Sequence, residues 1–123
     1  MATGILPKLM NGTDSGWQSY TNSDVFTGTI YYRKVGVFFM IQAQAIHVVN
    51  AVNAGAYVLL MTLPSAYRPA KEIMPNCFMN TGAVNNRIVS MRLTTGGDLY
   101  LYANKTDDIQ TTYSLYFSGF GFM

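Results

Sequence analysis

The stretch Leu63-Pro64-Ser65-Ala66-Tyr67-Arg68-Pro69 lies near the middle of the chain and decides how its two halves connect. Proline fixes φ and lacks a backbone N–H, so two prolines five positions apart exclude this stretch from an inner strand or a helix interior. It follows an apolar run, residues 57–63, which we interpret as a buried strand. Residues 63–69, hereafter the proline corner, are therefore predicted to form a rigid crossing that holds Tyr67 and Arg68 at defined angles.

Strand-like segments precede the proline corner. Residues 27–34 and 37–48 contain many β-branched and aromatic residues, and their side chains divide into two alternating sets, as on the two faces of a strand. Successive side chains of a strand point to opposite faces, so alternation predicts one inward and one outward face. In the second segment we expect the odd-numbered residues from Phe39 to Ala45 to face inward.

Further strand-like segments follow the corner, at residues 76–80, 87–93, 99–103 and 112–117, with predicted turns at Thr81-Gly82, Asn85-Asn86, residues 94–98 and residues 104–108. The chain thus has about eight strands at short, regular spacing and no helical period. This pattern predicts an all-β antiparallel domain, either a small β-barrel or a jelly-roll-like sandwich. Residues 1–16 are interpreted as an N-terminal arm or the remnant of a neck, and residues 17–123 as the domain itself.

Four phenylalanines and the one cysteine are expected in the core. Aromatic side chains dominate core burial, which favours inward positions for Phe38, Phe39, Phe78 and Phe117. Cys77 stands in an apolar setting and has no second cysteine to pair with, so we expect a buried, inert thiol. The C-terminal residues are also apolar, which predicts an inner strand or an interface element.

The composition is unusually poor in charge. Of the 123 residues, 50% are hydrophobic and 11% are charged, whereas about a quarter is usual for a soluble domain. The apolar runs are interrupted or fall well short of the roughly 20 residues that span a bilayer, so no membrane insertion is predicted. Burial against other copies of the chain explains the low charge better, because homo-oligomer interfaces are more apolar than ordinary surface.

The charge pattern also disfavours nucleic-acid binding. The net charge is +2, and the longest basic run is the pair Arg33-Lys34. Binding to a phosphate backbone uses many clustered Lys and Arg side chains. We therefore expect no nucleic-acid partner.

Catalytic chemistry has little support in the sequence. The chain has one histidine and six acidic residues, of which only Asp107 and Asp108 are adjacent. Adjacent residues of a strand point to opposite faces, so this pair is a poor acid–base arrangement and is better interpreted as a solvated turn. No ligand set with metal-binding spacing surrounds His47. We expect no enzyme activity, no metal and no cofactor.

The aromatic residues indicate a different kind of site. A saccharide presents apolar C–H faces and hydroxyl groups, so its site combines an aromatic platform with polar side chains. Packing at the rim of the domain is the alternative role for each aromatic residue. The candidate contacts are Trp17, His47, Asn50, Asn53, Tyr67, Arg68, Asp98 and Tyr100.

Several motifs of the chain resemble a known family. They are Trp17 in an opening strand, the strand Tyr32-Arg33-Lys34-Val35-Gly36, the proline corner, and a closing strand rich in Tyr and Gly. In these motifs, residues 17–121 are similar to the C-terminal head domain of receptor-binding and tail-fibre proteins of phages that infect Gram-positive bacteria. The proline corner is the most specific part of the resemblance.

The resemblance implies a fold, an assembly and a location. It implies a β-barrel head that forms a homotrimer at the tail tip or baseplate of the virion, contacts other phage tail and baseplate proteins, and binds a saccharide of the host cell wall. A structural trimerisation module without glycan binding is the alternative. A polysaccharide depolymerase comes third, because it ordinarily needs paired carboxylates that the sequence does not visibly place.

Overall fold

The structure of the protein is a computed structural model that describes residues 14–82 and 87–123. Its strands are β1 (Gln18–Tyr20), β2 (Phe26–Thr27), β3 (Ile30–Val35), β4 (Phe38–Val48), β5 (Tyr57–Thr62), β6 (Asn76–Asn80), β7 (Arg87–Leu93), β8 (Asp98–Tyr102) and β9 (Ser114–Phe122), with one 3-10 turn, η1 (Ser65–Tyr67). Most of the predicted N-terminal arm and the predicted turn at Asn85-Asn86 lie outside the described residues.

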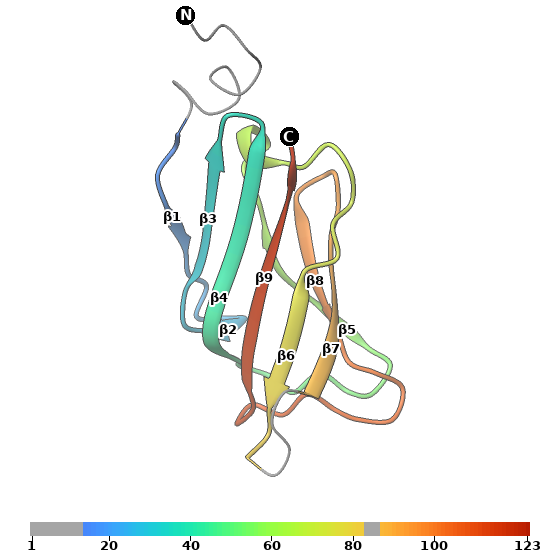
Figure 1. The fold of residues 1–123 in the computed structure, drawn as a ribbon. Helices are drawn as coiled ribbons and strands as arrows, with labels where there is room; N and C mark the ends of the chain where they lie inside the picture. The colour runs from blue at the N-terminus through green and yellow to red at the C-terminus, as the bar shows by residue number, and fades with distance from the viewer. Residues whose placement is uncertain (1–13, 83–86) are drawn as a thin grey trace, which may run out of the picture.

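The strands form a nearly closed antiparallel barrel of eight strands (Figure 1). Their order around the barrel is β1-β3-β4-β9-β6-β7-β8-β5, and β2 pairs with β4 beside this path. The all-β prediction is confirmed, and of its two forms the barrel is the one observed. No helix in the described part of the chain has the length and apolar character needed to cross a membrane.

The barrel interior is filled by the inward residues of each strand. Among the described residues no polar or charged side chain is buried. Val89, Met91 and Leu93 of β7 are buried while their neighbours Ile88 and Arg92 are exposed, as the alternation predicted. The interior is therefore an apolar core, and the chemistry of the molecule lies on its outer surface and loops.

The proline corner leaves the barrel at the end of β5 and turns through η1 (Figure 1). The amide of Tyr67 donates to the Pro64 carbonyl at 2.9 Å, which closes the turn. The corner is thus neither strand nor long helix, as predicted. The preceding strand differs from the prediction of a buried one, because β5 is the last strand of the order and turns Tyr57 and Leu59 outward, at 62% and 41% exposure.

A β-bulge in β4 overturns the expected inward position of Ala45. The register of β4 against β9 shifts between Ala43 and Ile46, and Ala45 takes a left-handed φ of 54°. The extra residue moves Ala45 to the outside and turns Ile46 into the core. Gly28 makes room for this, since a Cβ there would lie 2.8 Å from Ile46 Cγ2.

Two of the four predicted core phenylalanines face outward instead. Phe39 and Phe117 are buried, whereas Phe38 is half-buried and Phe78 is 39% exposed. Phe78 lies between Cys77 and Met79, which occupy the inward positions of β6, so alternation turns its ring outward. Cys77 is buried as expected, and burial raises the pKa of its thiol to about 12.

Candidate functional site

Three tyrosines and several polar residues gather on the outer face of β8, β5 and β7. We call this region the tyrosine surface. Its residues are Tyr57, Thr62, Glu72, Arg92, Asp98, Tyr100 and Tyr102.

Strand pairing brings these residues together. Leu99 and Leu101 of β8 are fully buried, so Asp98, Tyr100 and Tyr102 point outward along one line. On the neighbouring strand β5, Tyr57 lies opposite Tyr102 and Thr62 lies opposite Asp98. The positions of these five residues are therefore fixed by the paired strands of the barrel and not by a loop.

The three tyrosine rings form one contiguous aromatic platform. The ring centroid of Tyr57 lies 5.5 Å from that of Tyr100, at an angle of 82° between the ring planes, and 5.6 Å from that of Tyr102. The ring centroids of Tyr100 and Tyr102 are 6.3 Å apart. Edge-to-face and tilted arrangements of this kind are favourable for aromatic pairs. The rings thus support one another while leaving Tyr57 largely open to solvent.

Asp98 places a carboxylate at the end of this platform. The Thr62 hydroxyl donates to Asp98 Oδ1 at 2.7 Å, and the Asp98 backbone is fixed by the turn at residues 94–98, where the Thr94 amide donates to the Asp98 carbonyl at 2.9 Å. Desolvation first, and the negative charge of Asp98 second, raise the pKa of Tyr100. The Tyr100 hydroxyl is therefore protonated at neutral pH and can donate a hydrogen bond.

Arg92 borders the platform on β7, directly opposite Tyr100. Its Nε donates to Glu72 Oε1 at 2.9 Å, and a second guanidinium nitrogen reaches the same oxygen at 2.5 Å. The hydrogen bond to Glu72, followed by the interaction with Tyr102, raises the pKa of Arg92. The positive charge beside the platform is thus balanced by a carboxylate.

A second outward surface spans β4, β9 and β6, and we call it the neutral surface. Alternation with the buried residues of these strands turns outward Phe38, Met40, Gln42 and Gln44 of β4, Ser114, Tyr116, Ser118, Phe120 and Phe122 of β9, and Asn76, Phe78 and Asn80 of β6. None of these side chains is charged.

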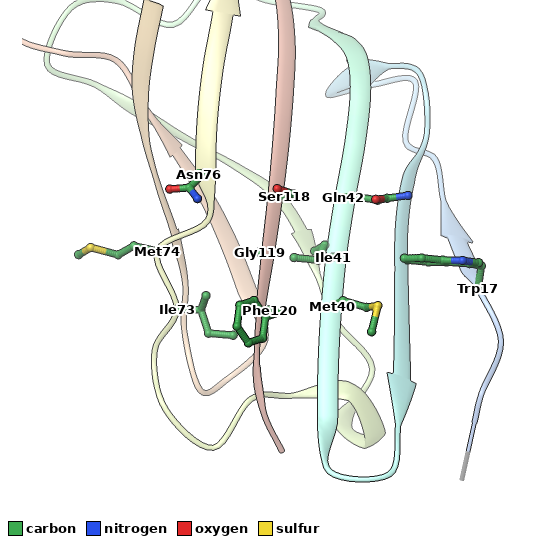
Figure 2. Close-up of a pocket in the computed structure, with 10 residues that line it drawn as sticks. All are labelled: Trp17, Met40, Ile41, Gln42, Ile73, Met74, Asn76, Ser118, Gly119 and Phe120. Carbon is green, nitrogen blue, oxygen red and sulfur yellow. The ribbon is translucent and has the colours of Figure 1, made fainter. Parts of the chain in front are cut away.

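A shallow pocket lies on the neutral surface (Figure 2). It has a volume of about 380 Å³. Trp17 lies at one side, Met74 at the other, and Phe120 between them. The Arg33 guanidinium carbon lies 5.7 Å from the centroid of the Trp17 ring, and Arg33 itself is paired with Asp14. Trp17 therefore belongs to the border of the neutral surface and not to the tyrosine surface.

Three other predicted contacts lie at the end of the barrel away from the proline corner (Figure 1). His47 is half-buried in β4, opposite Thr27 of β2. Asn50 and Asn53 are exposed in the connection from β4 to β5. The Asn53 carbonyl accepts a hydrogen bond from Ala56, which forms a tight turn.

Tyr67 and Arg68 hold the proline corner against the barrel. The ring of Tyr67 packs edge-on against Tyr32 of β3 at 4.8 Å, and the Lys34 ammonium lies 5.4 Å from the centroid of the Tyr67 ring. Arg68 Nε donates to the Leu63 carbonyl at 3.3 Å. Both residues thus have packing roles at the corner, and ligand contact by either stays a prediction.

Of the eight predicted contacts, the structure brings Asp98 and Tyr100 together on one platform. Sequence reasoning missed Tyr57, Tyr102 and Thr62 as their neighbours. The alternation Leu99-Tyr100-Leu101-Tyr102 was sufficient to add Tyr102. The two residues of β5 could be added only from the pairing of β5 with β8.

The two adjacent acidic residues of the loop after β8, Asp107 and Asp108, have structural partners. Asp107 forms an ion pair with Arg87, and Asp108 accepts a hydrogen bond from the Ala54 amide at 2.7 Å. Within residues 14–82 and 87–123, no three His, Cys, Asp or Glu side chains gather where they could hold a metal ion.

Comparison of the sequence with protein-family models gives no match. A search of curated proteins also gives no match.

Proposed function

We propose that this chain is a non-catalytic receptor-binding head of a phage tail, and that it binds a saccharide of the host cell surface through the tyrosine surface. In this proposal the protein is a homotrimer at the tail tip or baseplate of the virion, where it contacts other tail proteins. The observation that supports saccharide binding is the contiguous platform of Tyr57, Tyr100 and Tyr102 with Asp98 at its end.

The chemistry of the platform suits a sugar ring. Tyrosine offers an apolar ring face together with a hydroxyl group, so it can contact the C–H face of a sugar and bind its hydroxyls. The Asp98 carboxylate has about four acceptor sites, of which Thr62 uses one and Tyr100 another. The ligand hydroxyls can occupy the remaining acceptor sites. Because the strands already hold these groups in place, little conformational entropy is lost on binding.

The charges favour a neutral saccharide over an anionic one. Asp98 brings a negative charge to the platform, and the positive charge of Arg92 is balanced by Glu72. A phosphate or carboxylate on the ligand would meet the Asp98 charge without an unpaired cation on this surface to offset it. We therefore expect uncharged hexoses to bind better than phosphorylated or acidic sugars.

Trimerisation would raise the avidity of a shallow saccharide site for a cell surface. Single sugar contacts on an open platform are weak. Linked copies raise the overall avidity by about 10² to 10⁴ when they can bind at the same time.

Glycan-array and whole-cell binding of the labelled full chain test this proposal. The intact chain should bind neutral glycans and Gram-positive cells, and Tyr100→Ala should reduce that binding at least tenfold. Tyr31→Ala is the matched control, because Tyr31 is an outward strand tyrosine (41% exposed) on β3, away from the tyrosine surface. Equal binding by Tyr100→Ala and the intact chain would contradict the proposed site.

A structural tail module without glycan binding is the second candidate. The neutral surface favours it, since twelve outward side chains without charge suit protein–protein contact. A chain that trimerises but binds no glycan and no Gram-positive surface would support this candidate over the first.

A further inference from the structure

The neutral surface exposes more apolar area than a monomer usually leaves in water. Phe120 and Phe122 are 70% and 58% exposed, and Met74 beside them is 70% exposed. With roughly 150 to 250 Å² as the full area of each large side chain, these residues together with Phe78 and the bordering Trp17 and Ile88 expose on the order of 550 to 900 Å². The largest apolar patch of a typical monomer is about 300 to 600 Å².

A row of neutral polar groups crosses the middle of this surface. Gln42 lies opposite Ser118 in the pairing of β4 with β9, and Ser118 lies opposite Asn76 in the pairing of β9 with β6. Figure 2 shows the three side chains at the same level on three adjacent strands, with Met40 and Phe120 along one side of the row. On the other side lie Phe78 and Tyr116, whose rings are stacked with centroids 5.1 Å apart and an angle of 9° between the ring planes.

The polar row identifies the kind of partner. Amide and hydroxyl groups donate as well as accept hydrogen bonds, so around a three-fold axis one end of the row can pair with the other end of the row in the next copy. A charged surface is complementary to its opposite and not to itself. The absence of charge on the outward positions of β4, β9 and β6 therefore favours a second copy of this chain over a different protein that is selected by charge.

The borders of the surface have the polar character expected of an interface rim. The Arg33–Asp14 pair lies on one side, next to Trp17, and the Arg92–Glu72 pair lies on the other, with Arg92 on β7. Stable interfaces have a dry apolar centre with a polar rim and bury about 800 Å² on each partner. The apolar area estimated above, extended by the polar row, reaches that size.

We infer that copies of this chain meet through the neutral surface, with the Trp17 pocket and Phe120 at the contact. This inference rests on the homotrimer proposed above and adds the surface that forms it. The strand order separates β6 from β8 by β7, so assembly through β4, β9 and β6 leaves the three tyrosines of β8 and β5 free, with Arg92 of β7 between them and the contact. Each copy then displays its own platform outward.

Sedimentation velocity of the full chain tests the contact. The intact chain should sediment as a trimer at micromolar concentration, and Phe120→Glu should shift it to monomer, with at least a hundredfold loss in association constant. Val49→Glu is the control, because Val49 is an exposed apolar residue (38%) after the end of β4 and outside the neutral surface. A monomeric intact chain, or a trimer that survives Phe120→Glu, would overturn the inference.

Thiol labelling gives a second measurement that does not rely on a disruptive charge. Ser118→Cys should react with maleimide at least tenfold more slowly than Ser23→Cys, which places the thiol in an exposed turn. The native Cys77 is buried and does not compete. Equal labelling of the two variants in the assembled protein would overturn the inference. Glycan binding is measured separately through Tyr100→Ala, so failure of the contact and failure of the proposed site give different results.

Discussion

Replacing Gly28 with alanine tests the bulge that sets the register of β4. Gly28 has a φ of +107°, which L-residues rarely adopt, and an added Cβ would lie 2.8 Å from Ile46 Cγ2. Backbone strain of this kind costs about 1 to 3 kcal/mol, and overpacking a well-filled core costs about 1 to 3 kcal/mol more. We expect the free energy of unfolding to fall by roughly 2 to 6 kcal/mol, a large part of the stability of a small domain.

Urea unfolding followed by far-UV circular dichroism measures this loss, at one fixed protein concentration because the proposed self-association would also contribute to stability. With an m-value of about 2 kcal/mol/M, the midpoint should drop by about 1 to 3 M. Gly55→Ala is the matched control, because its φ is +79° and a Cβ there meets nothing within 4 Å. Equal losses in the two variants would refute the reasoning, since strain alone would then account for the effect and the contact with Ile46 for none.

Two further predictions concern titratable groups. Burial raises the pKa of Cys77 to about 12, so iodoacetamide at pH 8 should label the native chain at least a hundredfold more slowly than the urea-unfolded chain, and comparable rates would contradict its buried position. A hydrogen bond from Thr106 and the charge of Arg87 lower the pKa of Asp107, so its stabilising effect is full above the unfolded value of about 3.9 and is lost as the pH falls through the lower folded value. Asp107→Asn should therefore be less stable than the parent at pH 7 and should lose less stability between pH 5 and pH 2, whereas parallel acid profiles would contradict this assignment.

The strand pattern could be predicted because each strand carries its own period of two. Residues 87–93 alternate so cleanly that burial in the structure follows the sequence position by position. The proline corner was equally local, because proline acts on its own backbone and needs no tertiary partner. Features decided by neighbours in sequence could therefore be predicted correctly from the residues alone.

Features decided by strand pairing could not be predicted. The run at residues 57–63 is apolar at almost every position, so nothing in it indicated that β5 ends the strand order and exposes Tyr57. The bulge at Ala45 depends on the registers of β4 with β9, and it broke an alternation that looks regular in the sequence. Phe78 is a different case, because alternation with Cys77 and Met79 decides its face, and the prediction of a core position was wrong because it relied on residue type.

The candidate site shows the same division. Asp98 and Tyr100 were chosen from one segment, and alternation within that segment brings them onto one face. Thr62 and Arg92 come from other strands, and their distance from Tyr100 in sequence contains no indication that they border it. Trp17 and His47 were chosen by residue type and by the polar residues near them in sequence, and the structure places them on different sides of the barrel from the tyrosine surface.

The charged residues of the ion pairs are distributed unevenly over the barrel surface. Three ion pairs, Arg33–Asp14, Arg87–Asp107 and Arg92–Glu72, lie outside the outward positions of β4, β9 and β6. A composition that was merely short of charge would scatter the remaining charges over every face, whereas here the neutral positions occupy three adjacent strands. Because one barrel has outward residues on every strand, the proposed contact between copies and the proposed saccharide site can lie on different strands of a single domain. Phe120→Glu should therefore weaken assembly and leave the affinity of a single platform for the saccharide unchanged. Tyr100→Ala should lower that affinity and leave assembly unchanged.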